Sequence, residues 1–167
     1  MPDVVLADAT AAMSHADATF IAAVHGFAIG AAVELCCACD LRIAAEGATF
    51  RVPAARLGVV YHAAGIGRLR AAFGPAGVSR LLLLGDPISA READAMGALV
   101  RCVASDDLDA TVDEIVARLG GIDRESFAAN RDFLRALARD PGDHEARVAH
   151  EAARARAYAR LGAGRRG

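Results

Sequence analysis

The hydrophobic pattern is densest over residues 20–40, and we expect this segment to organise the rest of the chain. It opens with an apolar run that ends at Val24, which is typical of a strand covered on both faces. Gly26 and Gly30 interrupt the run, and small apolar residues then continue over residues 31–39 in the manner of a buried helix. The pattern predicts a strand, a tight turn and a helix whose N-terminus faces a ligand.

The remainder of the chain predicts short apolar strands and helices that end at glycines. Ser89 and Glu92 have the spacing of a capping box at the start of one helix. There is no internal repeat or linker of domain-boundary length, so we expect a core over residues 1–104 and an oligomerisation-type helical region over residues 105–167 in the same domain. The expected strands cover residues 19–24, 40–45, 49–52 and 99–104. The expected helices cover residues 1–18, 31–39, 66–73, 76–84, 89–96, 108–119, 126–139 and 144–161. Residues 54–67 are expected to form a loop.

Composition and charge exclude several classes of function. At 167 residues the chain fits one domain with a buried core. Its formal net charge is −2 and its charges are spread along the chain, so we expect no nucleic-acid partner. His25, two glycines and Glu34 interrupt the apolar segment before it reaches the roughly 18 uninterrupted apolar residues of a membrane span. We therefore expect a soluble protein with no membrane partner.

Four cysteines are present, and three of them lie in the expected helix over residues 31–39. Cys36 and Cys39 can share a helix face, but zinc sites normally need a second group of ligands, and none occurs at suitable spacing. Free cysteines behave as small buried hydrophobic residues, so we expect core packing and no metal site. With no signal peptide ahead of them, they indicate a reducing, cytoplasmic compartment.

The residues of this region resemble the crotonase superfamily, that is, the enoyl-CoA hydratases and isomerases. The segment from Phe20 to Leu35 resembles the family's IAAVNGxAxGGGxEL signature. The likeness is close over residues 19–104 and looser over the C-terminal helices, and so many spaced matches are more specific than a single glycine motif. Further matches are Cys39–Ala44, Ala48–Phe50, Leu57–Gly58, Arg68–Leu69, Leu84–Ala90 and Glu92–Val100.

The resemblance implies an α/β fold of the ClpP/crotonase type, a spiral of ββα turns followed by C-terminal helices. Family members have a substantial region before the signature, with several strands, part of the CoA-binding surface and one of two oxyanion-hole N–H groups. Only a short expected helix precedes the signature here, so we expect a spiral that lacks its N-terminal strands. Family members are usually trimers or dimers of trimers, and a shortened sheet exposes an edge that needs cover. We therefore expect a homo-oligomer, a trimer or a hexamer.

The resemblance places the candidate site at the start of the helix expected over residues 31–39. The backbone N–H of Ala31 aligns with the family's second oxyanion donor, and the first N–H groups of a helix have no partner within it. Gly30 and Gly26 are candidates for close approach of the backbone to a thioester. Glu34 aligns with a family general acid/base, and its apolar neighbours disfavour the alternative of an exposed first-turn carboxylate.

Ala54 widens the range of reactions that the resemblance implies. Hydratases carry a second catalytic glutamate at the position of Ala54, and a single carboxylate can act either in a concerted hydration or in double-bond migration. Tyr61 and His62 lie where the family usually has a Pro-Gly turn and are candidate pocket residues, with core packing and an ordinary loop position as the alternatives. Gly65 and Gly67 are interpreted as turn residues with positive φ.

Two functions remain open from the sequence. The first is an enoyl-CoA hydratase/isomerase-type enzyme that stabilises a thioester enolate, with an acyl-CoA as substrate and no separate cofactor. The second is a catalytically silent, shortened paralogue or fragment that acts as an oligomer partner. The first is favoured if the neighbouring upstream reading frame encodes the N-terminal region and supplies it as another chain, and the second is favoured if no such segment exists. A misassigned start codon is a third alternative.

Overall fold

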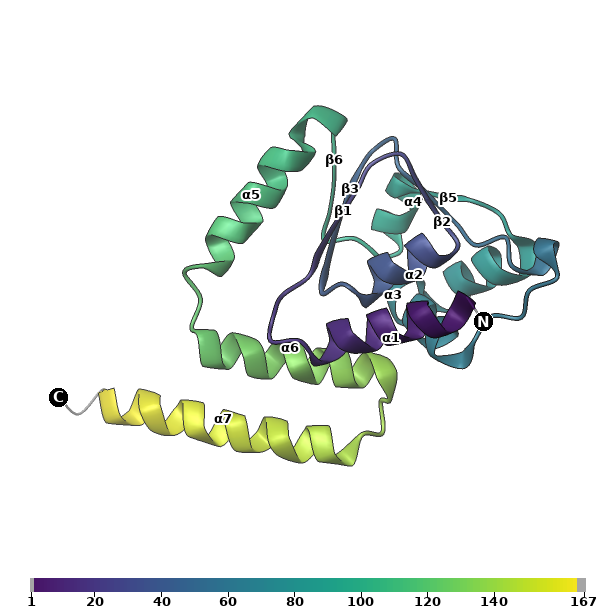
Figure 1. Cartoon of the computed structure of the whole chain (residues 1–167). Coiled ribbons are helices and arrows are strands. Elements are labelled where there is room, and N and C mark those ends of the chain that lie inside the picture. The colour runs from purple at the N-terminus through teal and green to yellow at the C-terminus, as the bar shows by residue number, and fades with distance from the viewer. Residues whose placement is uncertain (1, 165–167) are drawn as a thin grey trace. The chain divides into compact units, whose positions relative to one another are not determined.

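The computed structural model describes residues 2–164, with side chains for residues 4–161. It divides into two compact units, residues 1–117 and residues 118–167 (Figure 1). The helices are α1 (Pro2–His15), α2 (Ala31–Ala38), α3 (Ala63–Ser79), α4 (Ala90–Ala95), α5 (Leu108–Leu119), α6 (Arg124–Arg139) and α7 (His144–Gly164). The strands are β1 (Ile21–Val24), β2 (Phe27–Ile29), β3 (Leu41–Ala45), β4 (Thr49–Arg51), β5 (Ile88–Ser89) and β6 (Arg101–Val103), and short helical turns cover Ala55–Leu57 (η1), Arg80–Leu84 (η2) and Ser105–Asp107 (η3).

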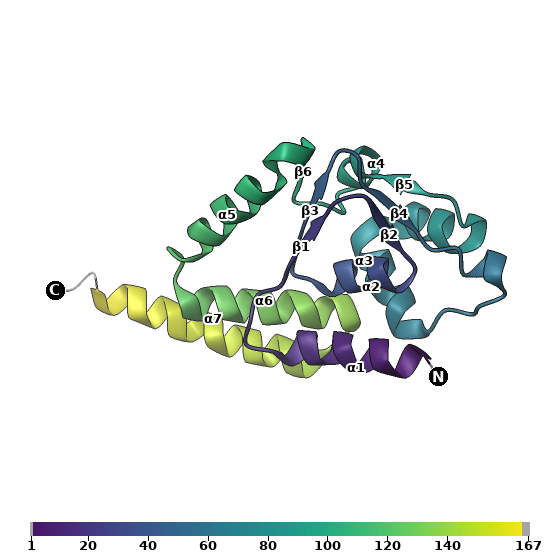
Figure 2. The ribbon, with the colours of Figure 1, turned by 45° about the horizontal axis from the view of Figure 1, so that its top comes forward.

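The first unit repeats a strand–strand–helix unit, first as β1, β2 and α2 and then as β3, β4 and α3. β1 pairs in parallel with β3, and β2 pairs in parallel with β4, so each strand of one repeat lies beside its counterpart in the next (Figures 1 and 2). The two sheets have the orders β1-β3-β6 and β2-β4-β5. This is the α/β spiral of ββα turns that the family resemblance implies, and β1 and β2 are edge strands among the strands described.

The prediction of a tight turn between the first strand and α2 is wrong, because this segment contains strand β2. Gly26 has a φ of 68°, which favours glycine, and it redirects the chain from the first sheet to the second. The residues after it pair with β4, with Ala28 buried and Phe27 and Ile29 exposed. That alternation is characteristic of a strand, but a strand of 3 residues is too short for the sequence pattern to distinguish it from a turn. The short strand β5 was missed for the same reason.

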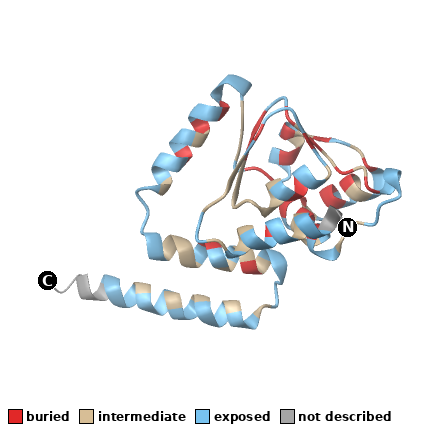
Figure 3. Ribbon diagram, viewed as in Figure 1, coloured by how far each residue is buried: buried red, intermediate tan, exposed pale blue. Residues whose placement is uncertain are grey.

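The core of the first unit lies between the sheets and the helices that cover them, where Figure 3 shows buried residues gathered. Phe50 from β4 meets Phe73 from α3 edge to face, with 5.5 Å between the ring centroids. Val33 from α2 and Leu69 from α3 are fully buried in the same cluster. Burial of these side chains fixes the faces of α2 and α3 that turn towards each other.

Helix α3 begins earlier than the predicted helix, at residue 63, and continues through the predicted break at Gly74. The break is present as a kink, because Gly74 has non-helical dihedral angles (φ 69°, ψ 176°) and Pro75 follows it. The predicted capping box is confirmed, since the Ser89 hydroxyl accepts from the backbone N–H of Glu92 while the Glu92 carboxylate accepts from the backbone N–H of Ser89.

The second unit is a pair of helices, α6 and α7, which pack along one another in opposite directions (Figures 1 and 2). Phe133 stacks on the His150 ring with 4.4 Å between centroids, and Arg160 on α7 pairs with Glu125 on α6. Over residues 2–164, no helix has both the length and the apolar character needed to cross a membrane.

Candidate functional site

The start of α2 is shaped by Gly30, which occupies the position before the first helical residue. Its dihedral angles are φ 59° and ψ −118°, a combination that residues with a side chain rarely adopt. The Gly30 N–H donates to the Arg51 carbonyl in β4 at 2.8 Å, so the turn is anchored to the second sheet. Ala31 begins the helix and is exposed, and the Val33 N–H donates to the Gly30 carbonyl at 3.0 Å, which closes the first turn.

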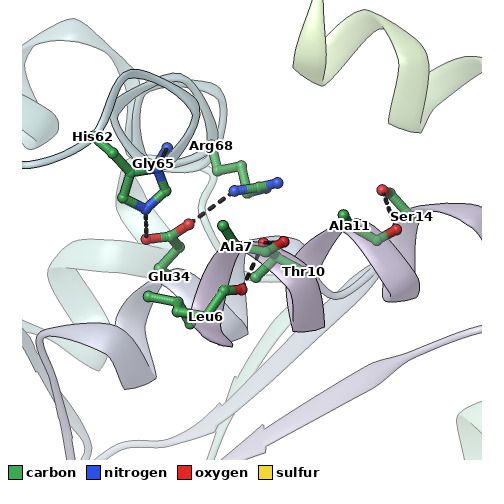
Figure 4. Close-up of polar contacts among 9 residues, drawn as sticks. All are labelled: Leu6, Ala7, Thr10, Ala11, Ser14, Glu34, His62, Gly65 and Arg68. Atoms are coloured by element: carbon green, nitrogen blue, oxygen red, sulfur yellow. Dashed lines mark hydrogen bonds and ion pairs between the residues drawn. The ribbon is translucent and has the colours of Figure 1, made fainter. Parts of the chain in front are cut away.

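Glu34 lies one turn into α2, and its side chain has 0% exposed surface. Each carboxylate oxygen has its own partner (Figure 4). Oε1 accepts from Nη1 of Arg68 at 2.8 Å, and Oε2 lies 3.0 Å from Nε2 of His62. A buried carboxylate without partners would be strongly destabilising, so these two contacts are what allow the charge inside the fold.

His62 ends the loop before α3 and caps that helix. Its Nδ1 accepts from the backbone N–H of Gly65 at 3.3 Å, and its ring stacks on Tyr61 with 5.5 Å between centroids. Because Nδ1 accepts, the proton of the neutral ring lies on Nε2 and is donated to the Glu34 carboxylate. One side chain therefore joins the start of α3 to the acid group on α2.

Gly65 allows α3 to approach the carboxylate. A Cβ atom at this position would lie 2.7 Å from Oε2 of Glu34 and 2.7 Å from Cε1 of Tyr61, closer than side chains tolerate. Gly65 and Gly67 both lie inside α3, and neither is among the glycines with positive φ, so their interpretation as turn residues is wrong. The requirement at Gly65 is space for an acid side chain.

Of the other predicted residues, Tyr61 contacts this cluster, because its ring stacks on that of His62. Ala54 is buried in the hydrophobic core, and its carbonyl accepts from the N–H groups of Leu57 and Val59, which closes the loop after β4. Gly26 is exposed in the β1–β2 connection. Tyr61 packs against the core as well as against the His62 ring.

Helix α1 packs against α2 and passes the carboxylate in Figure 4. The Thr10 hydroxyl lies 3.0 Å from the Leu6 carbonyl and 3.1 Å from the Ala7 carbonyl, so it bonds within its own helix. The side chain of Glu34 has no exposed surface, and its two partners come from α3 and the residue that caps α3.

Cys36 and Cys37 in α2, and Cys39 directly after it, carry no negative charge to the site. Burial is the main cause that raises the pKa of the Cys37 thiol from 9.0 to about 12, and the nearby Glu34 charge adds a small part. Burial likewise raises the pKa of Cys39 to about 11 and that of Cys36. These thiols are free and protonated at neutral pH. Within residues 4–161, no group of three or more His, Cys, Asp or Glu side chains could hold a metal ion.

Sequence reasoning missed two residues of the cluster, Arg68 and Gly65. Arg68 entered only as part of a family match, although a carboxylate inside an apolar helix requires a cation within reach. That requirement was the available signal, and Arg68 lies on the next helix along the chain. No comparable signal identifies Gly65, because the contact that needs it joins two different helices.

Comparison with known proteins identifies relatives over most of the chain. The enoyl-CoA hydratase/isomerase family matches residues 5–158. A probable enoyl-CoA hydratase of Mycobacterium leprae is 38% identical over 135 residues, which cover 78% of this chain and 52% of that protein. A carnitinyl-CoA dehydratase of Salmonella heidelberg is 34% identical over 125 residues, with 75% of this chain and 48% of that protein covered.

Comparison with a solved structure shows similarity to an enoyl-CoA hydratase in the fold as well. The crystal structure of a putative enoyl-CoA hydratase from Thermobifida fusca YX, in complex with acetoacetyl-CoA, has a TM-score of 0.78 at 30% identity. The match covers 95% of this chain and 63% of that one. The chain spans about half the length of the two curated relatives, at 52% and 48%.

Proposed function

Because the chain belongs to the enoyl-CoA hydratase/isomerase family, we propose that it acts on an acyl-CoA and stabilises the enolate of the thioester, with Glu34 as the acid/base. One observation carries the proposal. The carboxylate of Glu34 is held by two partners inside the fold, one turn from a helix start where Ala31 is exposed. A buried, partnered acid one turn from a helix N-terminus suits proton transfer next to a carbonyl, because the first N–H group of a helix has no acceptor within it.

The proposed chemistry divides the work between the backbone and the side chain. The thioester oxygen accepts from the N–H of Ala31, which is favoured by the helix dipole as negative charge develops on that oxygen. Glu34 takes the proton from the α-carbon, and the electron pair of that C–H bond moves into the enolate. Return of the proton to the γ-carbon completes double-bond migration. In hydration, Glu34 directs water to the β-carbon and a proton to the α-carbon.

Ala54 favours a mechanism with a single carboxylate. Its side chain is apolar and buried in the core, so this position supplies no second acid. Double-bond migration needs only one group that takes and returns a proton, whereas hydration by one group must be concerted. The CoA thioester is the substrate in both, and we propose no further cofactor.

The test is incorporation of deuterium at the α-carbon of a short acyl-CoA in D2O, followed by NMR, with the 3-enoyl isomer, whose α-protons are acidic, and with crotonyl-CoA, which gains an α-deuterium when it is hydrated or isomerised. Exchange reports enolate formation for both reactions, and the same spectra separate hydration from migration. We expect Glu34→Gln to lower the exchange rate by at least about 100-fold, the lower end of losses from single catalytic groups. Glu46→Gln is the matched control, because Glu46 forms an exposed ion pair with Arg91. An unchanged rate in Glu34→Gln refutes the proposal.

A second candidate function is that of a silent oligomer partner, and one observation favours it. The Glu34 side chain is completely enclosed, while large apolar side chains elsewhere in the first unit are exposed, among them Phe27 at 80%, Val60 at 91% and Leu83 at 73%. Apolar surface of this kind favours association. We propose a homo-oligomer for either function, and light scattering coupled to gel filtration tests it. A monomer at all concentrations would contradict the proposed assembly.

A further inference from the structure

The contact between Glu34 and His62 has a role that the proposed function does not include. We propose that His62 is a positioning residue, which sets the direction of the Glu34 carboxylate through its Nε2–H while its Nδ1 caps α3. This inference rests on the proposed function of Glu34, and the experiments below separate the failure of one from the failure of the other.

A carboxylate needs two contacts to have a defined orientation. The terminal torsion of a glutamate side chain is broad, so a single partner leaves the carboxylate plane free to rotate. Arg68 holds Oε1 at 2.8 Å and His62 holds Oε2 at 3.0 Å, and the two partners come from the same helix, α3, or its cap. Together they fix the plane of the carboxylate relative to α2.

The two partners differ in what they supply. Arg68 is always charged and neutralises the carboxylate, and its side chain is 13% exposed. His62 supplies one directional N–H and is 26% exposed, so it is the more accessible of the two. Losing Arg68 removes the charge compensation, whereas losing the His62 donor removes one hydrogen bond and the direction that it gives, and leaves the compensating charge in place. His62 is therefore where orientation can be changed without leaving the carboxylate unpaired.

The N-cap determines which nitrogen of His62 donates. The Gly65 N–H points at Nδ1, so a proton on Nδ1 would face another donor. The neutral ring with its proton on Nε2 satisfies both contacts at once. This gives an observable prediction, because the two neutral forms of the ring have different ¹⁵N resonances. We expect the Nε2–H form, and a ring protonated on Nδ1 overturns the inference without any measurement of turnover.

Two substitutions separate the positioning role from the capping role. Asparagine is a good N-cap, so His62→Asn keeps an acceptor for Gly65 but is too short to reach Glu34. Glutamine places an amide N–H near the position of Nε2, so His62→Gln keeps a donor for Glu34 and gives up the cap. We expect His62→Asn to keep the cap of α3 but to melt earlier, because Oε2 of the buried carboxylate loses its donor. We also expect it to lower kcat by up to about 100-fold with KM unchanged, since a misplacement of about 1 Å can have this effect. We expect His62→Gln to melt earlier and to recover part of that kcat.

The control is His144→Asn, which replaces an exposed histidine at the start of α7. We expect this variant to keep both the melting temperature and the kcat of the unmodified protein. If His62→Asn has the kcat of the unmodified protein while Glu34→Gln is inactive, the positioning role is overturned and the proposed function stands. If Glu34→Gln keeps the full exchange rate, the proposed function fails, and the role of His62 in it fails with it. A kcat that falls in His62→Asn and recovers in His62→Gln supports the inference.

Discussion

Gly65 and Gly67 lie in the same helix and offer a matched pair of substitutions with opposite expected effects on stability. Both are inside α3 and have backbone angles that alanine can adopt. A Cβ on Gly67 meets no heavy atom within 4 Å, whereas a Cβ on Gly65 lies 2.7 Å from the Glu34 carboxylate oxygen and 2.7 Å from the Tyr61 ring. Only the surroundings distinguish the two positions.

The expected free-energy changes follow from these distances. Replacement of glycine by alanine within a helix stabilises by about 0.8–1 kcal/mol when the new methyl group is unobstructed, which is the case for Gly67→Ala. In Gly65→Ala the same gain is offset by overpacking, which typically costs about 1–3 kcal/mol. The contacts involve a carboxylate with two fixed partners and a packed ring, neither of which can shift freely, so we expect the upper half of that range. Gly65→Ala is then destabilised by about 1–2 kcal/mol relative to the unmodified chain.

The chain has no Trp and 2 Tyr residues, so tyrosine fluorescence can be assigned to single sites. In a Tyr158→Phe background the signal comes from Tyr61, which packs beside the cluster. Urea unfolding of Gly65→Ala and Gly67→Ala in that background gives the two free energies of unfolding. The reasoning is refuted if Gly65→Ala is as stable as Gly67→Ala, because α3 would then not approach the carboxylate as closely as described.

Four further predictions concern charge and capping. Arg68→Met leaves the buried Glu34 carboxylate without its cation, so we expect a loss of about 3–5 kcal/mol in urea unfolding, and a loss below about 1 kcal/mol would contradict the pairing. Burial raises the pKa of Cys37 to about 12. The protonated thiol therefore contributes fully to the stability of the folded protein below pH 9.0, and this contribution is lost as the pH rises towards 12. At a given pH below 9.0, we expect its labelling by a thiol reagent to be about 1000-fold slower in the folded than in the urea-unfolded protein, and equal rates would show an accessible thiolate. Ser89→Ala removes the cap on α4 and should cost about 1 kcal/mol, measured by thermal unfolding. Arg80 and the cap hold the pKa of Glu92 at about 2, below its ordinary 4.5, so its stabilising effect is present above pH 4.5 and is lost as pH falls towards 2.

The order of strands and helices was predictable because the local pattern carries it. The apolar run before Gly26, the capping box at Ser89 and the break at Gly74 all depend on residues near one another in the sequence. Strand β2 was missed, because its identity depends on pairing with β4 far along the chain. The early start of α3 was missed because His62 caps it, and histidine is not among the preferred N-cap residues.

Of the residues in the candidate site, the sequence identified the acid, Glu34, more readily than the partners that hold it. The acid at position 34 was found through its apolar surroundings and through resemblance, since a charge within a buried helix needs an explanation. Its partners on α3 depend on how α2 and α3 pack together, and the sequence pattern does not predict that contact. The cluster of Glu34, His62, Gly65 and Arg68 is therefore a property of the folded first unit.

The order of the strands has a consequence for how the first unit meets other polypeptides. β1 and β2 follow one another along the chain, and each lies at the border of its own sheet. An incoming extended segment could hydrogen-bond to both in succession through main-chain groups alone. Recognition of that kind would tolerate exchange of most side chains on the incoming segment, but it would be broken by proline, which has no N–H to donate.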